Sequence, residues 1–372
     1  MNETAEKSDR LQRLAAAESV SGILLTLQPN FAWLTGGRTN RIDGSREAGA
    51  GALLITVDGR RFAIASRIER PRLTQEALDG LEFEIVEYPW TEERADPGLV
   101  YRLAAKAAGG RIGTDGVSAD ALPLDGRITR LRTPLLAPEI ERYRELGRDV
   151  GRILGETARA TTPGATEEAI AGSLGAALMR AGIRPVVLLS AADDRISRFR
   201  HPVPTPLPWR HRLLLATCAE RHGLVVAASR LVTAAAPDAD LIRRTEAAAR
   251  VCGALLEATR AGATGAALFE AAADAYSTCG YPGEEQLHHQ GGAIGYRARD
   301  WVAHPRSDEI VTPAQAFAWN PTVTGTKIEE TVLLHTDGRY ETVTTTEGWP
   351  AIRVRVRDCT VGLPGILSGA GR

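Results

Sequence analysis

The sequence lacks cysteine pairs, a stripe of one charge and any long apolar run, and each absence excludes a class of protein. Its four cysteines show no CxxC or other zinc-binding spacing, so we expect reduced thiols in a cytoplasmic protein. The formal net charge is -1, and charges of both signs are mixed without a basic stripe, so we expect no nucleic-acid partner. No apolar run approaches the roughly 20 residues of a membrane span. The polar N-terminus does not fit a secretory signal, so we expect no membrane association.

What remains is an ordinary globular composition, 44% hydrophobic, in a chain of 372 residues, which is long enough for two domains. Helix and strand patterns alternate over residues 1–134, which predicts an α/β domain. A helix is predicted over residues 5–19. Two strands at 52–57 and 61–65, joined by Asp58-Gly59, predict a hairpin. A further helix is predicted over 68–78. The polar loop 36–44 is either a solvated connection or an arm that carries Arg38, Asn40 or Arg41 to an anion.

Residues 135–372 contain an internal repeat. The tripeptides Gly164-Ala-Thr166 and Gly262-Ala-Thr264 lie 98 residues apart, and each joins two helical patterns. Gly182 and Gly280, at the same offset, end the second helix of each unit. One such unit cannot bury its helical face alone. We therefore expect the two units to stack about a pseudo-two-fold axis over a common sheet, with a site between the halves.

Residues 316–334 read as two extended runs joined by a bend at Pro321 and Gly325. Polar side chains, among them Asn320, Lys327 and Glu329, are set into this apolar hairpin. The stretch is either a surface hairpin with its polar face in water or part of a buried site, where a carboxylate needs a partner.

Five motifs in order resemble the pita-bread fold family of creatinase, aminopeptidase P, prolidase and methionine aminopeptidase. Asn30-Phe-Ala-Trp-Leu-Thr-Gly36 resembles the family's "N-x-x-Y-L-T-G" in the N-terminal domain. Pro138-Glu-Ile-Glu141 resembles its "K-x-x-x-E-I", and Thr162-Pro-Gly-Ala-Thr-Glu167 its "x-P-G-x-T-E". His201-Pro202 lies where the family has a catalytic histidine, and Lys327-Ile-Glu-Glu-Thr331 resembles "R-I-E-D-T". The resemblance implies a creatinase-like domain (1–134) followed by a pita-bread domain (135–372).

The metallopeptidases of this family bind two metal ions through Asp, Asp, His, Glu and Glu. The resemblance places Thr217 and Ala228 at the two Asp positions, Asn320 at the first Glu and Glu329 at the second. The metal-binding His position falls at Gly292, or at His289 if the alignment has a gap. One carboxylate cannot offset the desolvation of two divalent ions, so we expect no metal and no cofactor.

Creatinase, by resemblance, implies hydrolysis without metal, with a histidine at the His201 position as base or proton shuttle. We expect at least one of His288 and His289 to act with it, with Glu329 orienting a histidine or binding a substrate cation. Asn320 and Thr217 would replace charged ligands by neutral hydrogen-bonding groups. Lys327 would pair with Glu329 or hold a carboxylate, and Arg299 is either a salt-bridge residue or a substrate ligand. The resemblance also implies a homodimer, in which Arg38 and Asn40 reach the partner's site.

The predicted function is therefore a metal-independent, creatinase-like enzyme that acts on a small, polar, amino-acid-derived molecule. The expected chemistry is hydrolysis of a C–N bond, with an elimination or a rearrangement in a biosynthetic pathway as the variant. The alternative is a catalytically inactive pita-bread binding protein, which needs no convergence of His201, His288 and His289. A third possibility is a divergent metalloaminopeptidase, which would need Cys218, His222 or Asp300 as substitute ligands.

Overall fold

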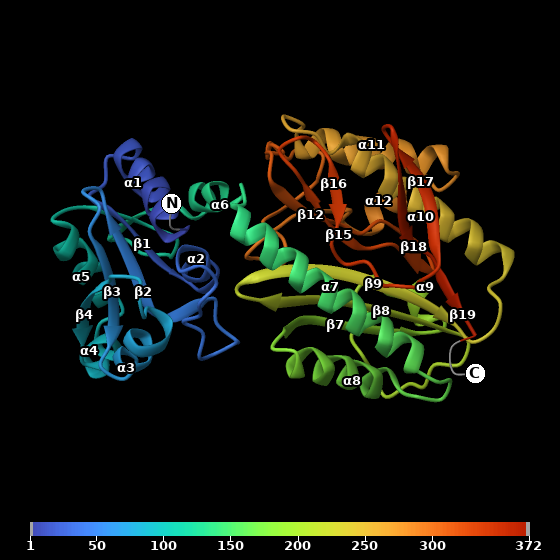
Figure 1. Cartoon of the computed structure of the whole chain (residues 1–372), viewed down its shortest axis with the longest axis horizontal. Coiled ribbons are helices and arrows are strands. Elements are labelled where there is room, and N and C mark those ends of the chain that lie inside the picture. Colours follow the sequence, from blue (N-terminus) through green and yellow to red (C-terminus); the bar gives the residue numbers. More distant parts are fainter. Residues whose placement is uncertain (1–2, 370–372) are drawn as a thin grey trace. The chain divides into compact units, whose positions relative to one another are not determined.

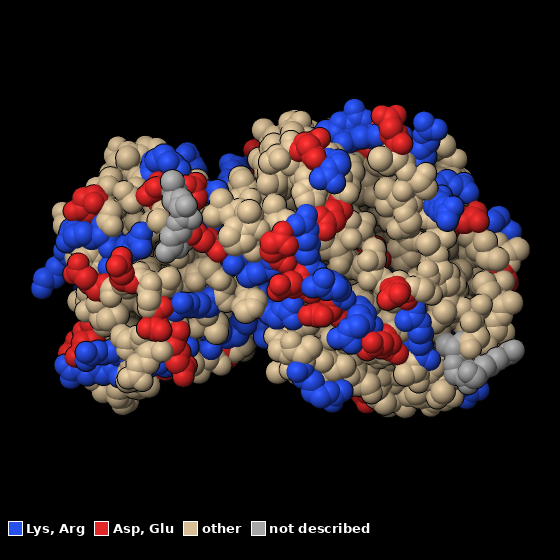
Figure 2. All heavy atoms as spheres, viewed as in Figure 1, with Lys and Arg blue, Asp and Glu red and all other residues tan. Residues whose placement is uncertain are grey.

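The computed structural model describes residues 3–369, which fall into two compact units. The N-terminal unit extends to Glu139 and the C-terminal unit begins at Ile140, within the first turn of helix α7 (Ala137–Ala160) (Figure 1). The sequence places the boundary slightly earlier, between residues 134 and 135. Charged side chains of both signs are interspersed on the face shown in Figure 2, as the mixed composition predicts. Among the described residues, no helix is both long and apolar enough to cross a membrane.

A six-stranded sheet forms the centre of the N-terminal unit, in the order β4-β3-β2-β1-β5-β6. Strand β2 pairs antiparallel with both β1 and β3, whereas β4 pairs in parallel with β3, β5 with β1 and β6 with β5. The strands are β1 (Gly22–Leu27), β2 (Ala48–Thr56), β3 (Arg61–Ser66), β4 (Glu84–Tyr88), β5 (Ile112–Thr114) and β6 (Ala121–Pro123). The helices are α1 (Glu3–Ala17), α2 (Gln28–Leu34), α3 (Arg70–Arg72), α4 (Trp90–Ala95), α5 (Leu99–Ala108) and α6 (Asp125–Arg132). Ala104 on α5 packs against Leu24, Leu54 and Ile64 of the sheet to form the core.

The predicted hairpin is confirmed as β2 and β3, with Gly59 at φ +91° in its turn. The predicted helix over 68–78 is only partly confirmed. Three residues of α-helix are followed by a π-turn from Leu73 to Ala77, and the N–H of Leu78 donates to the carbonyl of Leu73 at 2.7 Å. This bond runs from residue i to residue i−5, whereas the predicted α-helix would have bonds from i to i−4.

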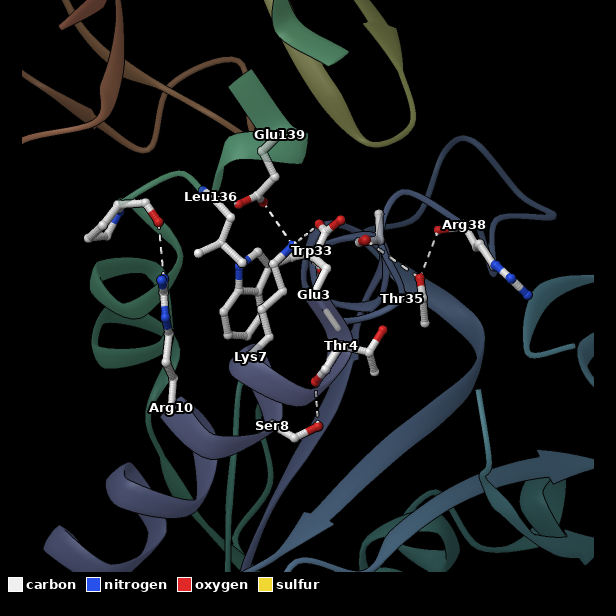
Figure 3. A network of polar contacts seen from close by, with 12 residues as sticks. Glu3, Thr4, Lys7, Ser8, Arg10, Trp33, Thr35, Arg38, Leu136 and Glu139 are labelled. Carbon is white, nitrogen blue, oxygen red and sulfur yellow. Dashed lines mark hydrogen bonds and ion pairs between the residues drawn. The ribbon is translucent and has the colours of Figure 1, made fainter. Parts of the chain in front are cut away.

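Lys7, on α1, is fully buried and holds together three parts of the N-terminal unit (Figure 3). Its ammonium lies 2.6 Å from Glu3 and 2.8 Å from Glu139, and it donates to the carbonyl of Trp33 at 2.7 Å. The other oxygen of Glu139 accepts the N–H of Leu136 at 2.8 Å. Two carboxylates and a carbonyl thus satisfy one buried cation, as burial of a charge requires.

The C-terminal unit contains two main sheets, in the orders β19-β9-β8-β7 and β11-β10-β12-β15-β16. The first comprises β7 (Arg184–Ala192), β8 (Arg212–Arg221), β9 (Leu224–Thr233) and β19 (Ile366–Ser368). The second comprises β10 (Gly291–Ile294), β11 (Trp301–Val302), β12 (Gln315–Trp319), β15 (Glu330–Leu334) and β16 (Tyr340–Thr342). Thr331 of β15 joins them, because its hydroxyl accepts the N–H of Ala227 at 2.8 Å and donates to its carbonyl at 2.9 Å.

The internal repeat appears as two matching helix pairs (Figure 1). The first pair is α7 with α8 (Glu167–Arg180), and the second is α10 (Ala239–Ala258) with α11 (Gly265–Thr278). Thr166 and Thr264 are the N-caps of α8 and α11, and each hydroxyl accepts a backbone N–H at 3.2 Å. Gly164 and Gly262 precede them at φ +99° and +88°. A hairpin of β17 (Ala351–Val356) and β18 (Cys359–Pro364) packs against α10.

The polar stretch is an inner hairpin rather than a surface one. Strands β12 and β15 pair antiparallel, from Gln315 opposite Leu334 to Trp319 opposite Glu330. Two short strands, β13 (Thr322–Val323) and β14 (Thr326–Lys327), continue the hairpin to its turn at Gly325. All residues of these four strands are buried, so the surface interpretation is wrong.

Candidate active site

Three histidines converge in the C-terminal unit from two segments far apart in the chain. His201 follows helix α9 (Arg195–Arg198), and His288 and His289 lie between helix α12 (Glu284–Leu287) and β10. The Nε2 atoms of His201 and His288 are 3.2 Å apart, and one ring nitrogen from each of the three residues lies within 4.8 Å of the others. The rings of His288 and His289 stack at 4.5 Å. A proton can therefore pass between His201 and His288 without a large movement.

All three imidazoles are held in the neutral form near pH 7. Burial, followed by the charge of Lys327, lowers the pKa of His288 to about 2. Burial, followed by the charge of Arg299, lowers the pKa of His289 to about 4. His201 is exposed at the rim, and burial of part of its ring together with Lys327 lowers its pKa as well. Neutral imidazoles can accept a proton, which is the state that a general base requires.

A cavity of about 170 Å³ adjoins the cluster. His201 and His289 line it, whereas His288 lies behind them, so the structure places His289 rather than His288 at the cavity. The Nδ1 atom of His289 accepts the N–H of Gly291 at 3.2 Å, which leaves the proton of the neutral ring on Nε2. The other lining residues are Val187, Leu189, Ala216, Thr217, Cys218, Ala298, Arg299, Asn320, Lys327 and Glu329.

Glu329 is buried in this wall between two cations. Its Oε2 atom lies 2.9 Å from the ammonium of Lys327 and its Oε1 atom 3.1 Å from the guanidinium of Arg299. Burial raises the pKa of Glu329, but the two cations outweigh it and hold the pKa below its usual range. Its carbonyl accepts the N–H of Ser229 on β9 at 3.1 Å. Glu329 is thus a fixed, ionised counterion rather than a free proton acceptor.

The positions that would hold two metal ions carry a different set of groups. The hydroxyl of Thr217 donates to the carbonyl of Val187 at 2.9 Å, and Ala228 is a buried methyl on β9. The Oδ1 atom of Asn320 is buried without a hydrogen-bond partner among the described residues. Glu329, the one carboxylate, is already neutralised by cations. These donors do not fit a pair of divalent ions, which need several anionic oxygens.

The residues considered as substitute metal ligands do not supply such a set. Cys218 lines the cavity, but burial raises the pKa of its thiol to about 11, so it is protonated near neutral pH. His222 lies in the turn between β8 and β9 at φ +55°. The carboxylate of Asp300 packs beside Gly295.

Arg38 and Asn40, the predicted contacts to a partner's site, lie in the N-terminal unit. Arg38 donates to the carbonyl of Asp79 at 2.6 Å. Asn40 is fully buried, and its amide donates to the carbonyl of Gly51 at 2.8 Å. Sequence reasoning missed the apolar wall formed by Val187, Leu189 and Ala216. The signal was present, because Val187 and Leu189 alternate on one face of β7.

Solved structures share this fold over nearly the whole chain. The prolidase from Thermococcus sibiricus superposes with a TM-score of 0.77 at 17% identity, over 93% of this chain and 98% of that one. The dipeptidase PepE from Mycobacterium ulcerans gives 0.76 at 19% identity, over 92% and 96% of the two chains. The N-terminal domain of the FACT complex subunit SPT16 from chickpea gives 0.67 at 12% identity, over 92% and 96%. No curated protein matches the sequence.

The sequence also matches a family model directly. The model of metallopeptidase family M24 covers residues 141–336, which is more than half of the chain and includes all three clustered histidines and Glu329. The chain therefore belongs to metallopeptidase family M24, and its resemblance to the pita-bread family of creatinase, aminopeptidase P and prolidase is confirmed.

Proposed function

We propose that this chain is a metal-independent hydrolase that cleaves a C–N bond in a small, polar, amino-acid-derived molecule, with His201 as the proton carrier. Membership of a peptidase family supports the hydrolytic class. The observation that carries the proposal is the convergence of three neutral imidazoles within 4.8 Å, beside a carboxylate that two cations already neutralise. A site with this composition suits proton transfer rather than coordination of two metal ions.

In the proposed reaction, water attacks the carbon of the C–N bond and gives its proton to Nδ1 of His201, because Nε2 is engaged by His288. The bond to nitrogen then breaks, and His201 returns the proton to the leaving nitrogen. Nε2 of His288 lies 3.2 Å from Nε2 of His201, and this contact orients the ring of His201. The exposed position of His201 lets it meet a substrate and water, while buried His288 behind it fixes its ring.

The alternative of an inactive binding protein is favoured by one observation, the shared fold with the SPT16 domain of the FACT complex. A binding module has no need of clustered neutral histidines. The distances in the cluster therefore support the enzyme over the binding module.

The test combines metal analysis with a turnover screen of small amides, ureas and guanidino compounds. We expect purified protein to hold far less than one metal ion per chain and to keep its turnover after treatment with EDTA. His201→Asn should lower kcat by about 10²–10⁴-fold, the range of general acid–base catalysis. His211→Asn, at an exposed site outside the cavity, is the matched control. Bound metal at one or two per chain, with loss of turnover in EDTA, would overturn the proposal.

A further inference from the structure

The cavity beside His289 carries an excess of one positive charge. Of its ionised lining residues, Lys327 and Arg299 are cations and Glu329 is the anion. Their side chains are 5%, 15% and 4% exposed, so solvent screens them weakly. The neighbouring charges are balanced, because Arg200 pairs with Glu284 at 2.7 Å and Arg230 pairs with Glu330 at 2.9 Å. A ligand that enters this cavity therefore gains most by bringing one negative charge.

The same wall has hydrogen-bonding capacity that the fold leaves unused. The ammonium of Lys327 has three donors, and within the described part of the chain Glu329 is its ion-pair partner. Among the described residues Nε of Arg299 is buried without an acceptor, and His289, whose proton is on Nε2, lines the cavity. Asn320 is 2% exposed, and its Oδ1 atom is a buried acceptor that has no donor within the described part of the chain. Buried polar groups without partners are costly, which indicates that a ligand satisfies them.

The remaining wall sets the size and character of that ligand. Val187, Leu189 and Ala216 present apolar surface, and the volume of about 170 Å³ admits a molecule of a few carbon atoms. Taking the proposed function as given, we propose that the substrate of this site is a small amino-acid derivative whose carboxylate has an N–H or O–H on the neighbouring carbon. The carboxylate lies against Lys327 and Arg299, and the neighbouring donor meets Asn320. Lys327 and Arg299 thus bind the negative charge of the ligand, as metal ions would in a metallopeptidase.

The test is calorimetric titration of the EDTA-treated full chain with three matched three-carbon probes, lactate, lactamide and propionate. Lactate should bind at least about tenfold more tightly than lactamide, which lacks the charge, and more tightly than propionate, which lacks the hydroxyl. Arg299→Gln should weaken lactate binding by at least about tenfold, and Arg299→Lys should restore part of it. Arg198→Gln, at an exposed cation outside the cavity, should leave it unchanged.

His201→Asn separates this inference from the proposed function. It should lower kcat by about 10²–10⁴-fold and change lactate binding by no more than about twofold, since His201 is not assigned to the anion. If lactamide binds as tightly as lactate, or if lactate does not bind at up to about 10 mM, the proposed anion site is overturned. The proposed function would still stand if turnover depended on His201. Lactate binding that appears only when Zn²⁺ is added would assign the three-histidine cluster to a metal instead and overturn both.

Discussion

At the scale of single residues, the buried imidazoles couple stability to pH. The pKa values of His288 and His289 lie at about 2 and about 4 in the folded chain, and near 6.5 in an unfolded one. Between these values the unfolded chain binds more protons than the folded one. The stabilisation is therefore complete above about pH 6.5 and is lost as the pH falls toward the folded values.

We expect the free energy of unfolding to fall between pH 7 and pH 5 by about 2 kcal/mol for each of these two rings. Urea denaturation of His288→Asn should show a pH-dependent loss smaller than that of the natural chain by about this amount. His211→Asn should keep the full dependence, because its side chain is exposed. Equal losses in all three proteins would contradict the neutral state of His288.

The ion triad around Glu329 gives a second prediction at this scale. Glu329→Gln leaves both Lys327 and Arg299 buried without their counterion, which should cost about 3–5 kcal/mol of unfolding free energy. Lys327→Met should cost less, since Arg299 still neutralises Glu329 at 3.1 Å. Chemical denaturation measures the loss of unfolding free energy in the two variants. A larger loss in Lys327→Met than in Glu329→Gln would refute this account of the triad.

At the scale of elements, the two halves of the repeat depend on the same backbone conformation. Gly164 and Gly262 adopt positive φ, and a Cβ added at either would meet no neighbouring atom within 4 Å. Gly164→Ala and Gly262→Ala therefore introduce backbone strain but no steric clash. Each substitution should destabilise the chain by about 1–2 kcal/mol.

Gly172 provides the matched control, because it lies inside α8, is exposed and also has open space around it. Gly172→Ala should stabilise the helix by about 0.5–1 kcal/mol. Thermal unfolding of the three variants should thus shift in opposite directions. A similar shift in all three would show that packing rather than φ determines their effects.

The elements also show how far sequence can predict this protein. Alternation and turn residues predict β2–β3, the repeat and the β12–β15 hairpin, because each depends on local pattern. They could not show that β12 and β15 are buried on both faces, since this depends on other parts of the chain, among them helices α10 and α11. Nor could they show which of two adjacent histidines lines the cavity, because that depends on the backbone where β10 begins.

At the scale of the whole molecule, we propose that two chains associate, as the resemblance to creatinase implies. His201 is exposed, and Phe199 and Val203 beside it are 40% and 69% exposed. An apolar rim of this kind around a polar site favours a covering surface. Light scattering should give about twice the chain mass of 39.8 kDa.

Val203→Asp should shift that mass toward one chain, because a charge opposes burial at an interface. Met179→Asp, at a residue that is 61% exposed on α8, should leave it unchanged. A single-chain mass for the natural protein at micromolar concentration would contradict the association.

The burial of two lysines has a practical consequence for the whole chain. Lysine occurs only at positions 7, 106 and 327, and Lys7 lies inside the N-terminal unit while Lys327 lies inside the C-terminal one. Lys106 alone among them is exposed, at the end of α5. Among the lysines, an amine-reactive dye that is too large for the cavity of about 170 Å³ should therefore attach at Lys106 in the native protein, and should react with Lys7 or Lys327 only when the respective unit unfolds. Peptide mapping of the dye would then give the labelling rates of Lys7 and Lys327, and each rate would report the unfolding of one unit separately.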